Sequence, residues 1–435
     1  MGAGERIVDD EMGVIADQFD AARLYTRETI ARLLEKTGFR NIRHHGNAEA
    51  VSDRDQDLGM MAKRLLLSAD APLRPARRAR GKAPQLDVTV VMGDPRLPDT
   101  VKRDGAFNPE DMETIRRLKD ALSELPGYRF RYLDTHATLA RDLSELRTDL
   151  VLNLCDEGFN NDPFKELHVP AMLEAMGLPY TGAGPAALAA CYDKSLVRAV
   201  AMTQDVPVPL ETLVRPGDQG ATLPSVLPAL LKPCYGDSSE GITKDAVVHN
   251  EKALLDYLER LRVSFPKRPI LVQEYLTGGE YSVTLMGNPD QGLRAFPVLE
   301  VDFSHLDPAL PKILGYESKW LPDSAYWTQV RYRETDLAEI QQQQLVEHSA
   351  RLFERLGCRD YARFDFRADA KGEIKLLEVN PNPGWCWDGK VNLMAGFGGM
   401  RYAEFLEQLL AAAVERLSIV ARAPERQLTH NEATA

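Results

Sequence analysis

Two short segments near the carboxyl end of the chain constrain its fold most strongly. One runs from Arg363 to Phe366 and the other from Leu377 to Gly384, and the polar pair Lys371-Gly372 lies between them. Both segments are typical of β-strands, and a two-residue turn at Lys371-Gly372 predicts a hairpin. In that register Asp365 lies opposite Glu378.

The same register fixes which side chains share a face, because successive residues of a strand point to opposite sides. The polar face is expected to hold Arg363, Asp365, Glu378 and Asn380. The opposite, apolar face is expected to pair Phe364 with Val379 and Phe366 with Leu377. An even loop length would keep these faces.

The polar face predicts a magnesium site. Magnesium prefers oxygen ligands and is usually held by one or two carboxylates together with substrate phosphates, and Asp365, Glu378 and Asn380 offer such oxygens. A magnesium-nucleotide site is the hypothesis that follows. The alternative is a solvated hairpin face with an incidental ion pair between Arg363 and a carboxylate.

Composition narrows the class of protein. A chain of 435 residues, 44% of them hydrophobic and 27% charged, predicts a globular protein of about two to four domains. Its net charge of -12 argues against a nucleic-acid surface. No signal peptide or membrane span is expected, and five scattered cysteines suit a reducing compartment, so we predict a cytoplasmic protein.

The order of elements predicts an α/β fold with separate domains. Residues 1–84 are expected to form a small α+β extension and linker, with helices from Thr26 to Lys36 and from Leu58 to Ser68. Residues 85–190 alternate strands and helices, which indicates a parallel-sheet domain. Residues 191–279 and 280–421 are expected to form a smaller and a larger domain, and residues 422–435 a flexible tail.

Acidic residues at the ends of the parallel strands are candidate substrate contacts. They lie in Gly93-Asp94 and in the run from Cys155 to Gly158, although turns use the same residue types.

A loop of small residues follows a buried strand that ends at Lys232-Pro233. Its glycines and the hydroxyls of Ser238 and Ser239 could donate hydrogen bonds to phosphate oxygens, whereas the bland interpretation is a plain hairpin loop. The strand from Ile270 to Leu276, followed by Glu280, could bind an adenine edge and a ribose. Lys194, Lys232 and Lys319 could neutralise phosphates, although each alone is more often a solvated side chain.

The order of these parts resembles the ATP-grasp superfamily, and within it the D-alanyl-D-alanine ligase family, over Asp87 to Ala413. The resemblance rests on seven motifs: Ala175 to Gly182, Asp193-Lys194, Lys232-Pro233 with the glycine-serine loop, Glu274 to Glu280, Glu317 to Trp320, Ala362 to Asp365, and Glu378 to Gly384. It implies an ATP-grasp fold preceded by the parallel-sheet domain. Separately, Ile30 to Phe39 resembles the end of a class I methyltransferase, without its cofactor loop.

The resemblance also implies roles for single residues. Lys194, Lys232 and Lys319 would contact phosphates; Gln273, Glu274, Tyr275 and Leu276 would form the adenine hinge; and Glu280 would bind the ribose. Two Mg²⁺ ions, for which Mn²⁺ could substitute, would be held by Asp365, Glu378 and Asn380. Arg363 and the amide of Gly384, assisted by Ser238, Ser239 and Lys319, would serve catalysis.

Three departures from the family pattern fall where substrates bind. Met92 to Leu97 replaces a loop whose glutamate holds the first substrate's amino group, so that contact would come from Asp94, Asp99, Glu110 or Asp111. Trp320 replaces a tyrosine. Trp385 to Lys390 replaces serines, so Trp385 and Trp387 are expected to enlarge and dry the pocket, and Asp388 or Lys390 to change its charge.

The favoured hypothesis is an ATP-dependent carboxylate-amine ligase that forms an amide or peptide bond through an acyl phosphate, with substrates other than two D-alanines. The alternatives are a true D-alanine–D-alanine ligase and a non-catalytic ATP-binding module. Expected partners are a small carboxylate and an amine, such as an amino acid or peptide, with neither nucleic acid nor membrane. The resemblance allows a homodimer.

Overall fold

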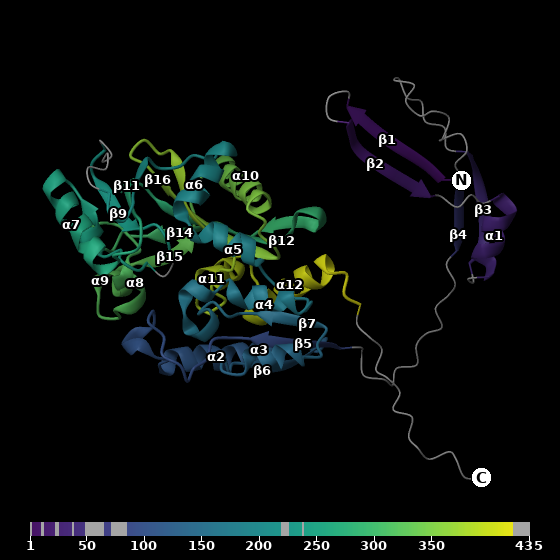
Figure 1. Ribbon diagram of the computed structural model, residues 1–435, viewed down its shortest axis with the longest axis horizontal. Helices are drawn as coiled ribbons and strands as arrows, with labels where there is room; N and C mark the ends of the chain where they lie inside the picture. The colour runs from purple at the N-terminus through teal and green to yellow at the C-terminus, as the bar shows by residue number, and fades with distance from the viewer. Residues whose placement is uncertain are drawn as a thin grey trace, which may run out of the picture. The chain divides into compact units, whose positions relative to one another are not determined.

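The computed structural model describes residues 2–9, 13–21, 26–36, 39–47, 65–70, 85–218, 226–236 and 239–420. The chain divides into two compact units, residues 1–81 and residues 82–435. Figure 1 labels most of the helices and strands of both. Ser238 and the tail from residue 422 lie outside the described residues.

The first unit holds two antiparallel strand pairs and one helix. β1 (Gly2–Asp9) pairs with β2 (Gly13–Ala21), β3 (Arg40–Asn47) pairs with β4 (Leu65–Asp70), and the helix is α1 (Arg27–Lys36). The first predicted helix is confirmed. The second is wrong where it can be checked, because Leu65 to Ser68 lie in β4. A short apolar run fits a strand as well as a helix, and pairing with β3 decides between them.

The second unit begins with a three-stranded parallel sheet in the order β6-β5-β7. Its elements are β5 (Leu86–Val91), α2 (Pro109–Ser123), β6 (Tyr128–Leu133), α3 (Leu139–Ser144), β7 (Leu150–Asn153) and α4 (His168–Ala175). The parallel sheet with alternating strands and helices that the sequence predicts for this part of the chain is confirmed. Because parallel strands end at one edge, the loops after β5 and β7 meet there.

Residues 185–203 form two helices and not one continuous helix. α5 (Pro185–Tyr192) ends before Asp193, and α6 (Lys194–Thr203) begins after it. The Asp193 carboxylate accepts hydrogen bonds from the backbone amides of Ser195 and Leu196, which is the geometry of a helix N-cap. Because of this break, Lys194 is the first residue of helix α6.

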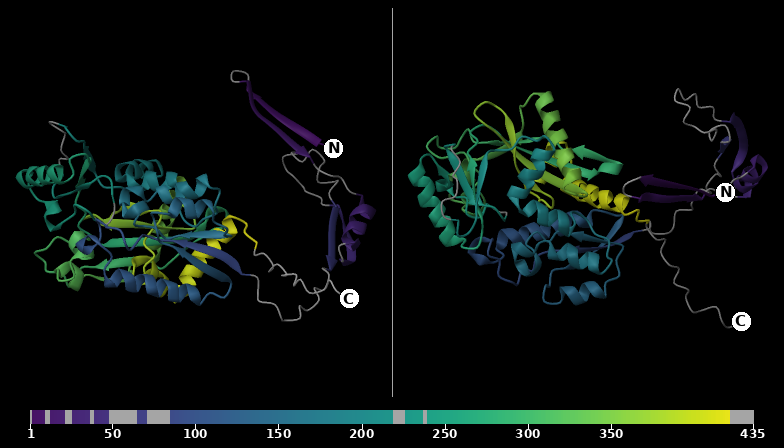
Figure 2. Two further views of the ribbon diagram at one scale, coloured as in Figure 1. Left: turned by 60° about the horizontal axis from the view of Figure 1, so that its bottom comes forward. Right: turned by 45° about the horizontal axis from the view of Figure 1, so that its top comes forward.

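A small antiparallel sheet follows, in the order β10-β9-β11-β8. Its strands are β8 (Glu211–Val214), β9 (Ala229–Pro233), β10 (Val247–Val248) and β11 (Ile270–Glu274). Helix α7 (Glu251–Ser264) packs against β9, β10 and β11, and Figure 2 shows it beside this sheet in both further views. Lys232 of β9 and the residues that follow β11, Tyr275 and Leu276, line the same cavity.

A six-stranded antiparallel sheet forms the centre of the unit. Five strands run in the order β15-β14-β12-β16-β17, and β13 also pairs with β12. The strands are β12 (Glu280–Asn288), β13 (Gly292–Ala295), β14 (Leu299–Asp302), β15 (Arg331–Glu334), β16 (Tyr361–Ala368) and β17 (Ile374–Asn380).

Helices cover this sheet on both faces. They are α6, α10 (Glu339–Arg355), α11 (Lys390–Phe397) and α12 (Tyr402–Arg416), while the short helices α8 (Tyr316–Trp320) and α9 (Ala325–Gln329) pack on each other between β14 and β15 in the chain. On one face Val283, Phe364 and Phe366 form a core with Phe353 of α10 and Val197 of α6. The other face carries the polar side chains of β12, β16 and β17. Within the described ranges, no helix has the length and apolar character needed to cross a bilayer.

Candidate active site

The predicted hairpin of β16 and β17 is present, with a different turn. Five residues, Asp369 to Glu373, connect the strands instead of two, and the Asp369 carboxylate accepts hydrogen bonds from the amides of Lys371 and Glu373. An odd loop length would move the functional residues to the wrong face. A register shift between Asp365 and Phe366 corrects this.

The shift preserves the predicted pairs at the functional end of the hairpin. Asp365 lies opposite Glu378, as predicted, whereas Phe366 pairs with Leu376 and not with Leu377. Leu376 is buried in the core in the position predicted for Leu377. Leu377 lines a cavity on the polar side instead. An extra residue in one strand therefore supplies an apolar contact within the site.

The polar face holds the four predicted side chains together. Arg363 donates from Nε and Nη2 to the Asp365 carboxylate at 3.0 to 3.2 Å. The Asn380 amide contacts Asp365 at 3.3 Å and Glu378 at 3.4 Å, and Ser282 of β12 donates to Asp365 at 2.6 Å. Arg363 and Asp365 are only 16% and 6% exposed, so their pairing takes place away from bulk water.

Neighbouring cations keep both carboxylates ionised. Burial opposes ionisation of Asp365, but Arg363 and Lys390 outweigh it, so its pKa lies below the usual range. Burial likewise opposes ionisation of Glu378, and Lys194 is the largest influence that lowers its pKa below the usual value. Asn380 donates from Nδ2 to both carboxylates here, and its amide also carries an oxygen. Two ionised carboxylates and an amide oxygen are a donor set that suits a hard divalent cation.

Three lysines approach this carboxylate pair from three elements. Lys194 begins α6, Lys232 lies in β9 and Lys319 lies in α8, and each is an electrostatic neighbour of Glu378. Burial, followed by the charge of Lys194, lowers the pKa of Lys232. The predicted phosphate lysines thus gather around the predicted metal ligands.

A cavity of about 230 Å³ lies between the small sheet and the central sheet. The predicted residues that line it are Lys232, Ser239, Gln273, Glu274, Tyr275, Leu276, Glu280, Lys319, Arg363, Asp365 and Glu378. Its remaining walls are largely apolar and include Leu230, Ile242, Ile313, Leu314 and Leu377. Apolar walls with a charged end suit a flat base attached to phosphates.

Several predicted nucleotide residues are held in place by other side chains. Glu280 is buried and accepts a hydrogen bond from Arg367 at 3.0 Å, and burial raises the pKa of Glu280. Lys375 donates to Glu274 at 3.2 and 3.3 Å. The Ser239 hydroxyl donates to the carbonyl of Leu314 at 2.9 Å.

A second cavity of about 290 Å³ opens on the other side of Arg363 and Glu378. Predicted residues in its wall are Lys194, Lys319, Arg363, Glu378, Asn380 and Gly384. Its far side is acidic and is lined by Asp99, Lys102, Asp156, Glu157 and Glu166. We call this the substrate cavity. Lys102 and Glu166 escaped sequence analysis, because neither lies in a motif or at a strand end.

Most of the acids expected to replace the missing glutamate serve the fold. The Asp94 carboxylate is occupied by Arg96 and by the amide of His136. Asp111 caps α2 and pairs with Lys102 at 3.2 Å, Asp99 accepts from two backbone amides, and Glu110 is exposed. Of the four, only Asp99 lines the substrate cavity.

The loop after β7 supplies the acids that face the cavity, as its place at a strand end suggested. Glu157 Oε1 lies 3.3 Å from Lys102 Nζ, while its Oε2 is buried without a hydrogen-bond partner among the described residues. The Glu157 carboxylate packs on Gly93, where an added Cβ would come within 2.5 Å of Oε2. Asp156 Oδ2 would lie 3.8 Å from a Cβ on Gly384. Burial, and then Glu157, raises the pKa of Asp156 well above its usual value.

The expectation for the two tryptophans is wrong, since neither lines the substrate cavity. Trp385 is 5% exposed, joins the core, and donates from Nε1 to Leu154 O at 2.8 Å and Asp156 Oδ1 at 3.2 Å. The Trp387 ring stacks under the Arg117 guanidinium. Lys390 lines the cavity of about 230 Å³ instead. Its Nζ lies 3.8 Å from Asp365 Oδ1 and 3.2 Å from Ser282 Oγ. Sequence spacing alone does not show which way a loop turns.

Comparisons with known proteins agree with this geometry. The family described as "D-ala D-ala ligase C-terminus" matches residues 221–411. The chain is 32% identical over 271 residues to the uncharacterized protein y4sG of Sinorhizobium fredii, covering 61% of this chain and 75% of that protein. It is 28% identical over 310 residues to the D-alanine–D-alanine ligase of the same strain, covering 70% of this chain and 93% of that enzyme.

A solved structure shows the same fold. The D-alanine–D-alanine ligase from Bacillus anthracis complexed with ATP superposes with a TM-score of 0.57 at 16% identity, over 77% of this chain and 99% of that one. The chain therefore belongs to the D-alanine–D-alanine ligase family and has the ATP-grasp fold, which makes it an ATP-dependent ligase that forms a C–N bond.

Proposed function

We propose that the protein joins a small carboxylic acid to an amine, one or both of them amino acids or peptides, through an acyl phosphate, and that the pair is not two D-alanines. The observation that carries this proposal is the pair of cavities on either side of Arg363 and Glu378. One has the composition of a nucleotide site, and the other ends in the carboxylates of Asp156 and Glu157 from the loop after β7.

The nucleotide would bind in the cavity of about 230 Å³. Its base would lie against the backbone from Gln273 to Leu276, its ribose near Glu280, and its phosphates near Lys194, Lys232 and Lys319. The buried lysines would offset phosphate charge more strongly than exposed ones, because screening by water is weaker there.

Mg²⁺, or Mn²⁺ in its place, would be held by Asp365, Glu378 and Asn380. No cluster of three His, Cys, Asp or Glu side chains with metal-binding geometry occurs in the described part of the chain. Two carboxylates and an amide oxygen completed by phosphates fit magnesium, which rarely has an all-protein cage. When bound, the ion would neutralise charge on the phosphates.

The chemistry then has two steps. In the first, a substrate carboxylate oxygen bonds to the γ-phosphorus of ATP, the bond to ADP breaks, and an acyl phosphate forms. In the second, the amine attacks the acyl carbon, and phosphate leaves as the C–N bond completes. Arg363 and the amide of Gly384 would stabilise the oxyanion that forms in the second step, after the amine attacks and before phosphate leaves, because preorganised donors favour such a charge.

The acidic end of the substrate cavity would bind the amine. Glu157 and Asp156 are adjacent, and Lys102 is the cation that lies 3.3 Å from Glu157. An ammonium group would offset both the burial and the charge of Glu157, which together raise the pKa of Asp156. Because Asp156 lies against Gly384, the same pair could accept the proton that the amine loses when it attacks.

Replacing Glu157 with Gln should raise KM for the amine-bearing substrate about 10- to 100-fold, since a hydrogen bond to a charged group is lost. Glu110→Gln is the matched control, because Glu110 is exposed at the start of α2. Steady-state kinetics at varied amine and saturating ATP measures both. Equal KM values for the two variants would remove Glu157 from amine binding.

Two alternatives remain. A D-alanine–D-alanine ligase would use the same nucleotide side, and a non-catalytic ATP-binding module would bind ATP without turnover. The second is disfavoured by the presence of Arg363, Asp365 and Glu378 together. The first is disfavoured by the acids of the substrate cavity. A homodimer, a cytoplasmic location and the domain limits at residues 84, 190 and 279 stay predictions of the sequence.

The test is magnesium-dependent phosphate release from ATP across a panel of amino acids and small carboxylic acids, with hydroxylamine present to trap an acyl phosphate. Hydroxamate formation with an acid other than D-alanine supports the proposal. Activity confined to D-alanine favours the first alternative. ATP binding without turnover for any acid favours the non-catalytic module.

A further inference from the structure

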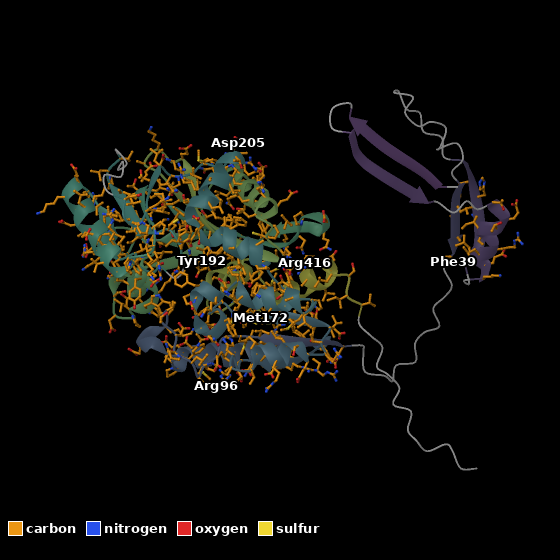
Figure 3. All side chains as sticks on the ribbon, in the orientation of Figure 1. Phe39, Arg96, Met172, Tyr192, Asp205 and Arg416 are labelled. Atoms are coloured by element: carbon orange, nitrogen blue, oxygen red, sulfur yellow. The ribbon has the colours of Figure 1, made fainter. Side chains whose placement is uncertain are left out.

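A third cavity, of about 270 Å³, adjoins the substrate cavity. We call it the apolar annex. It is lined by Pro163, Phe164, Glu166, Leu167, Leu188, Ala189, Tyr192, Tyr235 and Arg268. Figure 3 labels Tyr192, which lies at the end of α5.

The annex and the substrate cavity share part of their lining. Four residues line both of them: Pro163, Glu166, Leu188 and Tyr192. A molecule whose reacting group lies near Arg363 would therefore have the annex within reach of its side chain.

The annex walls are aromatic and remain partly open to solvent. Phe164 is 43% exposed and Tyr235 is 36% exposed. Removing such large apolar surfaces from water is favourable in free energy, so a ligand that covered them would be stabilised. The Phe164 and Tyr192 rings meet edge-on, with their centres 6.1 Å apart. The Arg268 guanidinium lies 4.4 Å from the centre of the Phe164 ring. Arg268 is itself paired with Glu240. The walls are thus held in position around a space that an apolar group would fill.

We infer that one substrate of this ligase carries a large apolar or aromatic side chain, and that this side chain occupies the annex. The inference rests on the proposed function and names the substrate class more closely. The methyl group of alanine would leave the annex empty. A leucine- or phenylalanine-like side chain would cover Phe164 and Tyr235, which are both partly exposed, and would be selected by the area it buries.

Ala189→Trp is the variant that tests this inference. Ala189 is exposed on α5 and lines the annex but not the substrate cavity, so the added indole would fill the annex and leave the reacting groups untouched. Ala186→Trp is the matched control, because Ala186 is exposed on the same helix and is absent from the walls of both cavities.

The measurement compares alanine, leucine and phenylalanine, in both stereochemical forms, as activators of phosphate release and as ligands in calorimetry with a non-hydrolysable ATP analogue. In the wild type, kcat/KM and affinity should favour the large side chains by about 10- to 100-fold. Ala189→Trp should abolish that preference, and Ala186→Trp should keep it.

The outcomes separate this inference from the proposed function. Phosphate release with no preference for large side chains, or a preference that survives in Ala189→Trp, overturns the annex and leaves the ligase proposal standing. If no amino acid stimulates phosphate release, the proposed function fails, and calorimetry decides the annex: tighter binding of phenylalanine that Ala189→Trp abolishes supports it, and equal binding of the three amino acids overturns it.

Discussion

Replacing Arg363 with Met should lower kcat by about 100- to 1000-fold, the effect of removing one preorganised oxyanion donor. KM for ATP should change little, because Arg363 contacts Asp365 at the junction of the two cavities and the lysines would hold the phosphates. Steady-state kinetics with the best acid of the panel measures both constants.

Arg294→Met is the matched control for Arg363→Met. Arg294 is exposed on β13 of the same central sheet, so its loss should leave kcat unchanged. Arg363→Lys should recover only part of the activity, since an ammonium keeps the charge but not the planar fork of donors. A kcat for Arg363→Met within threefold of the wild type would rule Arg363 out of catalysis.

Replacing Asp360 with Asn should destabilise the second unit by about 3–5 kcal/mol, because it leaves a partly buried arginine without its counter-ion. Asp360 is fully buried and accepts from Arg416 at 2.7 and 2.8 Å, from the amide of Gly182 at 2.8 Å and from Asn288 at 3.1 Å. Figure 3 labels Arg416 at the end of α12. Asp360 thereby joins the segment between α4 and α5, which holds Gly182, to β12 and α12. Urea denaturation measures the loss.

The same substitution at an exposed ion pair is the control. Asp336 pairs with Arg333 but its side chain is 82% exposed, so Asp336→Asn should cost less than about 1 kcal/mol. Arg416→Met combined with Asp360→Asn should cost less than the sum of the single changes, because the two residues share one interaction. Equal midpoints for Asp360→Asn and Asp336→Asn would contradict the account of this junction.

The part of the site that could be predicted from the sequence is the pairing of two neighbouring strands. The pairing of Asp365 with Glu378 follows from alternation along two strands, and the structure confirms it. The five-residue turn and the register shift were not predictable, because Lys371-Gly372 fits several turn types, and the shift compensates for the odd loop length. Leu377 therefore lines the cavity of about 230 Å³ on the polar side of the sheet instead of the core.

The less predictable part depended on where loops turn. Trp385 looked like a pocket residue by its distance from Gly384, yet its indole turns into the core and donates to Leu154 O. Asp94 lies at a strand end, as a substrate contact would, yet Arg96 and the amide of His136 occupy its carboxylate. Such competition among polar groups is decided by three-dimensional contacts that spacing does not encode.

The central claim is that a substrate carboxylate takes the γ-phosphoryl group of ATP before the amine attacks. The most direct test uses an acid from the panel labelled with ¹⁸O in both carboxylate oxygens, incubated with ATP, Mg²⁺ and the amine, followed by mass spectrometry of the phosphate. The account predicts one ¹⁸O atom in each phosphate released. Unlabelled phosphate, with both labels kept in the acid, would show that water took the phosphoryl group and would contradict the acyl-phosphate route.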